Sequence, residues 1–354
     1  MNLKKVGILL LTGMLFCTGC AERRDAMQKM VENKKMENRH EATTFAMDTI
    51  MTFTVIHEDG DEIIIDAEQE IRRLENILSI TAENSDVSRL NAAAGKEAVS
   101  IEKDTQILLE AGKELGDIAK GTFDIAISPV VKAWGFTEEA HRVPQQAELD
   151  ALLELTDPDA VILEEGRAFL QKEGMAVDLG GIAKGYTSDR VAELLKENGV
   201  ESAIFSLGGN VYGIGKKPDG AQWEVALANP LDANDYCGLI AIENQAVVTS
   251  GGYQRYFEED GKKYHHIIDP ATGYPAESGL LSVTIISESG IEADVLSTAL
   301  YVMGLEEGLA FWQEQGGFDA IFVTEAGEVV ATEGVCFTFE GQDNDFTYRM
   351  VERK

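Results

Sequence analysis

Residues 178–199 read DLGGIAKGYTSDRVAELLKENG, a glycine-rich turn followed directly by a helical pattern that ends at Gly199. The pattern predicts a helix over 182–198. Strand-like runs flank it: AVILE and AFLQ come before, and SAIFSLGG, WEVALA and GLIAIE come after. Because helices and strands mix without a regular βαβ order, the sequence predicts an α+β fold with mixed or antiparallel sheets and packed helices.

The same turn has features that suit phosphate binding. Gly180 and Gly181 allow a ligand to approach the backbone closely, and a helix start offers free N–H groups and a partial positive charge. Lys184 adds a full charge in the first helical turn. The P-loop pattern fails because Lys184 precedes Gly185, and the Rossmann pattern fails because Ile182 occupies the middle glycine position. The turn is therefore either an anion site or a structural joint.

Periodicity elsewhere predicts further elements of the same domain. Apolar residues recur at helical spacing over 62–78 and 104–120, and two more helices are expected at 291–303 and 305–315. Residues 121–136 show neither a helical nor a strand period, so we expect a long connection there.

The N-terminus predicts a membrane address. Residues 1–20, MNLKKVGILLLTGMLFCTGC, have a basic start, a short apolar run and a final cysteine. This segment is similar to a bacterial lipoprotein signal with Cys20 as the lipidated residue, the alternatives being an ordinary secretory signal or an uncleaved anchor. We expect a flexible polar tether over 21–44, a folded domain over 45–350, and a lipid-anchored location on the extracytoplasmic face of the cell membrane.

Charge and cysteine content narrow the function. The formal net charge of −32 argues against nucleic-acid binding, which requires faces rich in Lys and Arg. An acidic protein that acts on an anionic substrate needs local positive charge or a metal. Beyond the signal, Cys237 and Cys336 form neither a CxxC motif nor a metal-binding spacing, and whether they pair is open.

Four other stretches carry side chains suited to chemistry. In GTFDIAISPVVKAWGF (121–136), aromatic residues surround Asp124, either as pocket walls for a flat ring or as core anchors. In SLGGN and TSGGYQRYF, a glycine pair interrupts a strand-like run. We expect Ser250 of the second run to form hydrogen bonds, because no nucleophile elbow surrounds it. In HHIIDPATGYP, His266 suits a proton transfer or a ring contact, or is a surface residue.

The segment EADVLSTALYVMG (292–304) predicts a largely buried helix with two oxygen ligands on one face. Asp294 and Thr298 are i,i+4 neighbours. A buried carboxylate must be paired, protonated or metal-bound, and hard oxygens without Cys or His suit Mg²⁺ better than zinc. The alternative is that Asp294 caps its own helix.

Taken in order over residues 45–315, these stretches resemble the ApbE family of FAD:protein FMN transferases. The matching motifs are AMDT, SDVSRLN, GTFD with SPVVKAWGF, DLGGIAKGY, SLGGN, TSGGYQRYF, HHIIDPATGYP and EADVLSTALYVMG. The resemblance implies a single T-fold-related catalytic domain that uses Mg²⁺ to split the pyrophosphate of FAD. It further implies that FMN is attached through a phosphoester to a Thr or Ser of an extracytoplasmic partner flavoprotein, with release of AMP.

The resemblance also implies site residues. Those for FAD are Met47, Thr122, Phe123, Asp124, Asp178, Lys184, His266 and Ile268. Those for Mg²⁺ are Asp294 and Thr298 by side chain and Gly181 by its carbonyl, and the catalytic residues are His266, Asp294 and Lys184. One departure is that Ile80 and Thr81 stand where many relatives carry an aromatic residue. The alternatives are a Mg²⁺-dependent FAD pyrophosphatase giving FMN and AMP, or a non-catalytic flavin-binding lipoprotein.

Overall fold

The structure, a computed structural model, describes residues 38–136, 140–338 and 346–353. The predicted signal, Cys20 and most of the predicted tether lie outside these residues. Within them, no helix has both the length and the apolar character needed to cross a membrane.

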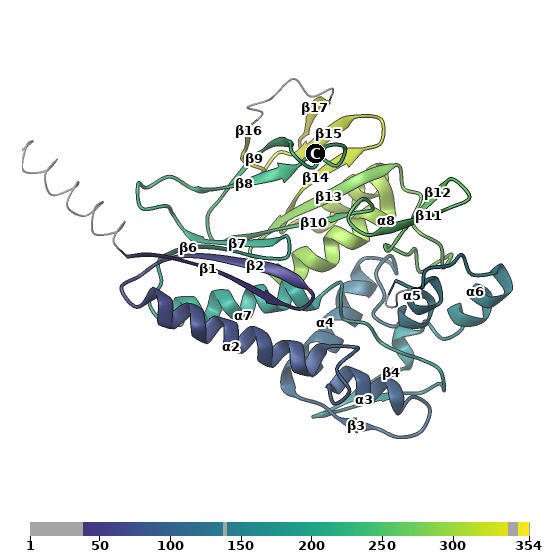
Figure 1. Ribbon diagram of the computed structural model, residues 1–354. Coiled ribbons are helices and arrows are strands. Elements are labelled where there is room, and N and C mark those ends of the chain that lie inside the picture. Colours follow the sequence, from purple (N-terminus) through teal and green to yellow (C-terminus); the bar gives the residue numbers. More distant parts are fainter. Residues whose placement is uncertain (1–37, 137–139, 339–345, 354) are drawn as a thin grey trace, which may run out of the picture.

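A nine-stranded sheet forms the centre of the molecule (Figure 1). Its order is β1-β2-β6-β7-β10-β13-β14-β15-β17. Every neighbouring pair is antiparallel except β15 and β17, which are parallel. The strands are β1 (Arg39–Ala46), β2 (Thr49–Ile56), β6 (Ser202–Leu207), β7 (Asn210–Gly215), β10 (Gln245–Gly251), β13 (Leu280–Ser287), β14 (Asp319–Thr324), β15 (Glu328–Thr332) and β17 (Thr347–Val351).

Three long helices cover one face of this sheet. They are α2 (Gly60–Leu78), α7 (Ala183–Glu197) and α8 (Gly290–Gln315). Figure 1 shows α2 and α7 beneath β1, β2, β6 and β7, with α8 against β10 and β13. The side chains of Met51, Phe53 and Val55 alternate along β2 and pack with these helices in the main core.

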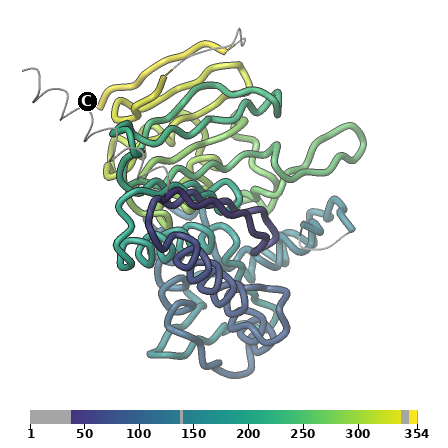
Figure 2. The backbone as a smooth tube through the Cα atoms, turned by 60° about the vertical axis from the view of Figure 1, so that its left-hand side comes forward, coloured from purple at the N-terminus to yellow at the C-terminus, as the bar shows by residue number. Residues whose placement is uncertain are grey.

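Smaller units surround this centre. A three-stranded sheet, β16-β9-β8, contributes Trp223 and Ile240 to a second core with Ile286 and Val323 of the large sheet. A second small sheet, β3-β5-β4, lies near α3 and α4, and the β11–β12 hairpin projects from the body (Figure 2). These elements are α3 (Asp86–Ala92), β3 (Val99–Ser100), α4 (Lys103–Ile118), α5 (Ser128–Trp134), α6 (Gln146–Leu153), a 3-10 turn (Pro158–Ala160), β4 (Val161–Glu164), β5 (Arg167–Leu170), β8 (Trp223–Ala228), β9 (Tyr236–Ile242), β11 (Tyr256–Glu259), β12 (Lys262–His265) and β16 (Phe337–Thr338).

The predicted α+β class is confirmed, and the structure adds detail to the helices. The expected helices at 62–78, 104–120 and 182–198 correspond to α2, α4 and α7. The two expected at 291–303 and 305–315 are the two parts of α8, which is interrupted at Gly304 with φ 79° and ψ 179°. Residues 121–136 contain the short helix α5, which begins with a proline in its first turn and ends at Gly135 with φ 82°.

One predicted boundary was wrong. The folded region begins at or before Arg39, so residues 39–44 of the expected tether belong to β1. Their side chains alternate between exposed and partly buried, without the apolar face that marks most strands. Backbone pairing with β2 from Arg39↔Ile56 to Ala46↔Thr49 places them in the sheet, and side-chain patterning does not report such pairing.

Candidate active site

A cavity of about 700 Å³ opens where the β1–β2 turn, the start of α7, the end of β10 and α8 meet. Segments from residue 47 to residue 298 contribute to it. Every residue that the sequence implicates in FAD binding, metal binding or catalysis lines this cavity: Met47, Thr122, Phe123, Asp124, Asp178, Gly181, Lys184, His266, Ile268, Asp294 and Thr298. The structure thus brings these residues together, and the role of each stays a prediction.

The DLGGIAKGY turn forms one wall of the cavity. The backbone N–H of Asp178 donates to the carbonyl of Ile125 at 2.8 Å, which ties this turn to the segment that carries Asp124. Asp178 Oδ1 accepts the N–H of Gly180 at 2.8 Å, and Lys184 Nζ donates to the Gly180 carbonyl at 3.2 Å. Burial raises the pKa of Asp178, and the Gly180 N–H only partly opposes this effect.

The GTFD segment lies against that turn. Asp124 Oδ1 accepts the N–H of Ala126 at 2.7 Å, and burial raises the pKa of this carboxyl. A Cβ on Gly181 would lie 2.9 Å from Phe123 Cε2, so a side chain at this position would require the ring to shift. This contact explains the glycine at position 181 in steric terms.

The β1–β2 turn brings Met47 to the cavity. Met47 and Asp48 have positive φ values of 49° and 58°, as a tight hairpin turn requires. The N–H of Met47 donates to Glu75 Oε1 on α2 at 2.6 Å. Glu75 also lines the cavity, but sequence reasoning missed it, because one more Glu on an acidic amphipathic helix carries no distinguishing pattern.

Asp294 is held in place by a hydrogen bond to the start of α7. Its side chain is buried, and Oδ2 accepts the N–H of Gly185 at 2.8 Å. The alternative that Asp294 caps its own helix is wrong, because Ser289 caps α8 by accepting the N–H of Glu292. Asp294 instead caps the first turn of α7, where the N-cap residue Ile182 offers no side-chain hydrogen bond.

Hydroxyl groups surround the other predicted metal ligand. Thr298 Oγ1 lies 3.1 Å from Ser250 Oγ, which lies 2.8 Å from Ser297 Oγ. The expectation that Ser250 takes part in hydrogen bonding is confirmed. No group of three or more His, Cys, Asp or Glu side chains suited to a metal occurs within 38–136, 140–338 and 346–353.

His266 is held in one tautomer by the backbone. Its Nδ1 lies 3.2 Å from the carbonyl of Arg255, which can only accept, so Nδ1 carries the proton and Nε2 has a free lone pair. Burial lowers the pKa of His266 to about 4, so the imidazole is neutral near pH 7. The preceding His265 lines a separate cavity of about 550 Å³ beside Tyr301.

Arg255 is a second residue that sequence reasoning missed. It lines the cavity, and its Nη2 donates to the carbonyl of Phe136 at 2.7 Å. Arg255 lies three residues after the glycine pair of TSGGYQRYF, and this was the one feature of the sequence that could have indicated it. Only Ser250 was assigned a role in that stretch. Arg255 and Lys184 line the cavity together with five acidic residues, namely Asp48, Glu75, Asp124, Asp178 and Asp294. The cavity is therefore acidic, although two cations stand in its wall.

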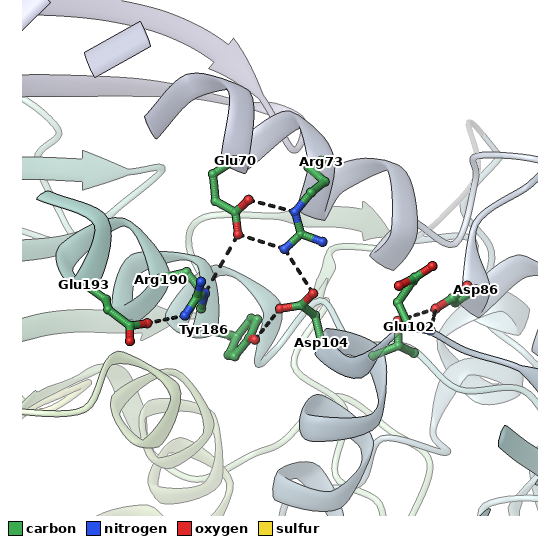
Figure 3. A network of polar contacts seen from close by, with 9 residues as sticks. Glu70, Arg73, Asp86, Glu102, Asp104, Tyr186, Arg190 and Glu193 are labelled. Atoms are coloured by element: carbon green, nitrogen blue, oxygen red, sulfur yellow. Dashed lines mark hydrogen bonds and ion pairs between the residues drawn. The ribbon is translucent and has the colours of Figure 1, made fainter. Parts of the chain in front are cut away.

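A polar network links the first turn of α7 to α2 and α4 (Figure 3). The hydroxyl of Tyr186 donates to Asp104 Oδ1 on α4 at 2.5 Å, and Arg73 of α2 pairs with Asp104 at 3.0 Å. Although burial opposes it, hydrogen bonding to Tyr186 and Arg73 lowers the pKa of Asp104. Three helices are thereby joined next to Gly185.

Comparison with known proteins places the chain in a family. The ApbE family model matches residues 47–322. An FAD:protein FMN transferase of Klebsiella pneumoniae is 39% identical over 281 residues, covering 78% of this chain and 87% of the relative. A second, from Treponema pallidum, is 34% identical over 281 residues, covering 75% and 78% of the two chains.

Solved structures give the same result. The crystal structure of the ApbE protein from Thermotoga maritima superimposes with a TM-score of 0.78 at 33% identity, covering 83% of this chain and 97% of that one. The flavin transferase ApbE of Vibrio cholerae superimposes with a TM-score of 0.74 at 27% identity, covering 85% and 96%. The resemblance inferred from the motifs is confirmed: the chain belongs to the ApbE family.

Proposed function

We propose that this protein is a Mg²⁺-dependent FAD:protein FMN transferase that attaches FMN to a Thr or Ser of a partner flavoprotein and releases AMP. The observation that carries the proposal is the meeting of all eleven predicted site residues, from distant parts of a chain of the ApbE family, in one cavity. In the reaction the acceptor hydroxyl oxygen attacks the phosphorus of the FMN half. The bond from that phosphorus to the bridging oxygen breaks, and AMP leaves with the electron pair.

The walls of the cavity suit the two halves of FAD. Met47, Phe123 and Ile268 supply apolar surface for the flavin ring, as flat aromatic ligands require. Asp124 and Asp178, each already anchored by a backbone N–H, offer polar atoms for its edges or for a ribose. The start of α7 and Lys184 favour the diphosphate.

The balance of charge supports a metal requirement. Five carboxylates against Lys184 and Arg255 would repel a diphosphate unless a cation bound with it. Asp294, Thr298 and the Gly181 carbonyl are hard oxygen donors, which suit Mg²⁺ bound together with substrate phosphates. Asp294 Oδ2 is engaged by Gly185, whereas the described residues supply no hydrogen bond to its Oδ1. When bound, Mg²⁺ offsets the charge of the diphosphate and stabilises the charge that develops on AMP.

Two side chains of the protein serve the proton and the leaving group. The neutral His266, with Nε2 unprotonated, is the general base that takes the proton of the acceptor hydroxyl. Lys184 stabilises negative charge on the departing phosphate from the first turn of α7. Its ammonium is steered by the Gly180 carbonyl, so little reorganisation is needed when substrate binds.

The location of the reaction follows from the N-terminal sequence. The signal-like segment 1–20 supports lipidation of Cys20 and tethering to the extracytoplasmic face of the membrane. A transferase held there would meet its acceptor flavoproteins as they emerge from or reside in the membrane.

One assay separates this function from its alternatives. The protein is incubated with FAD, Mg²⁺ and a recombinant extracytoplasmic flavoprotein that carries a Thr or Ser acceptor, and the products are run on a denaturing gel under ultraviolet light while AMP is measured. A fluorescent acceptor band with AMP supports transfer. AMP without a band indicates the pyrophosphatase. If neither a fluorescent band nor AMP is formed, the protein is a flavin-binding lipoprotein without this activity.

A further inference from the structure

The helices α7 and α8 carry the same short motif where they cross. Residues 185–189 read GYTSD on α7, and residues 290–294 read GIEAD on α8. In each, the glycine and the aspartate are four residues apart and therefore share a helix face. A Cβ on Gly290 would lie 2.6 Å from the carbonyl oxygen of Gly185, so the two backbones touch at the glycines.

The two aspartates cap each other's helices. Asp294 of α8 accepts the N–H of Gly185 in the first turn of α7 at 2.8 Å. In return, Asp189 of α7 accepts the N–H of Gly290 with Oδ1 at 2.6 Å and the N–H of Ile291 with Oδ2 at 3.0 Å. These two N–H groups are the first of α8, so the carboxylate satisfies donors that the helix itself leaves unpaired.

The two aspartates differ in their access to the cavity. Asp294 lines it, whereas Asp189 does not. Burial raises the pKa of Asp189, while the N–H groups of Ile291 and Gly290 act in the opposite direction. Asp189 therefore contacts the start of α8 outside the cavity and has no direct contact with the reacting groups.

We propose that Asp189 is a positioning residue that sets the orientation of the metal ligand Asp294 by clamping the start of α8 against the start of α7. The proposal rests on the metal site of the proposed function. The direction of the Asp294 carboxylate depends on where α8 begins and on the Gly185 N–H that binds Oδ2. Asp189 fixes both, because it holds Gly290 directly against Gly185.

Removal of one of the two acceptor oxygens of Asp189 should weaken its contact with the start of α8 without abolishing it. In Asp189→Asn, one oxygen remains for one N–H, while the new NH₂ group faces the other N–H without an acceptor. Groups that orient metal ligands typically change metal affinity by 10- to 100-fold when they are altered. We expect the Mg²⁺ concentration for half-maximal AMP release to rise by about tenfold, and kcat at saturating Mg²⁺ to change by less than about twofold.

Asp86 provides a matched control. It is buried, and Figure 3 shows it beside Glu102, whose N–H donates to Asp86 Oδ2 at 2.6 Å. The same oxygen accepts the hydroxyl of Thr105 at 2.8 Å, so Asp86 holds the start of α4 as Asp189 holds the start of α8. It does not line the active-site cavity. Asp86→Asn should lower the melting temperature without moving the Mg²⁺ requirement.

The experiment measures metal binding directly as well as turnover. Mn²⁺ binding to the full-length wild type, Asp189→Asn, Asp86→Asn and Asp294→Asn is followed by electron paramagnetic resonance, beside melting temperature and the Mg²⁺ dependence of AMP release. Weaker Mn²⁺ binding in Asp189→Asn but not in Asp86→Asn supports the proposal. Equal shifts in both, or none in Asp189→Asn while Asp294→Asn loses Mn²⁺, overturns it. Unchanged Mn²⁺ binding in Asp294→Asn, or none in the wild type, refutes the metal site itself.

Discussion

The backbone N–H of Gly185 donates to Oδ2 of Asp294 at 2.8 Å, and this bond joins two residues 109 positions apart in the chain. It connects the glycine-rich turn at residues 178–186 with α8, which carries the predicted metal ligands Asp294 and Thr298. The bond also uses one carboxylate oxygen and leaves the other for the cavity. Turn and helix therefore act as one unit, and several consequences can be measured.

The first prediction concerns the charge of Asp294. Asp294→Asn keeps an oxygen that can accept from Gly185 but removes the negative charge that a cation needs. We expect AMP release at ordinary Mg²⁺ to fall at least about 100-fold, with little change in melting temperature. Asp294→Ala should also abolish turnover, and it should cost about 1–3 kcal/mol of stability because the Gly185 N–H loses its acceptor. Full activity in Asp294→Asn would refute the metal assignment.

The second prediction tests the glycine contact between α7 and α8. A Cβ on Gly185 would overlap the Gly290 carbonyl and lie 2.7 Å from Asp294 Cβ. Gly185→Ala should force the helices apart and lower the free energy of unfolding by about 1–3 kcal/mol. Glu193→Ala, on an exposed position of the same helix, should change it by less than about 0.5 kcal/mol. Urea denaturation measures both, and equal values would contradict the packing argument.

The third prediction concerns Arg255 in the acidic cavity. The cavity lining includes one lysine, Lys184, one arginine, Arg255, and five acidic residues, and Arg255→Gln removes one of these two positive charges. We expect the KM for FAD to rise by roughly tenfold, because charge-assisted contacts to phosphate are worth about 1.5–3 kcal/mol. Lys263→Gln, on the nearby strand β12 but outside this cavity, is the control. If both variants keep the wild-type KM, Arg255 has no role in FAD binding.

The fourth prediction concerns pH and His266. Burial lowers the pKa of His266 to about 4, below the ordinary 6.5. Between these values the unfolded chain binds the proton and the folded chain does not, so stability decreases as pH falls from about 6.5 towards 4. His266→Gln should make this decrease shallower, with a residual slope because burial also lowers the pKa of His265. Urea midpoints at pH 7, 5.5 and 4.5 measure it, and parallel curves for the two proteins would contradict the prediction.

Local sequence patterns predicted the fold class and the main helices well. The apolar stripe of α2, from Ile64 through Ile71 to Leu78, needs no tertiary contact to be recognised, because burial repeats at helical spacing. The edge strand β1 was missed because main-chain pairing with β2 holds it. Glu75 and Arg255 were missed for a similar reason: their positions in the cavity come from contacts with the Met47 N–H and the Phe136 carbonyl, which are distant in sequence.

The sequence by itself determined the family motifs, the acidic charge and the pairing of Asp294 with Thr298 on one helix face, because each of these depends on residue type and short-range periodicity. Only the tertiary structure decided what Asp294 caps, that Glu75 and Arg255 border the cavity, and that Asp189 and Asp294 hold each other's helices. The sequence shows the two stretches GYTSD and GIEAD, but it does not show that their aspartates cap each other's helices. This capping arises from the direct contact of two glycine backbones, and that contact exists only once the large sheet has brought α7 and α8 together.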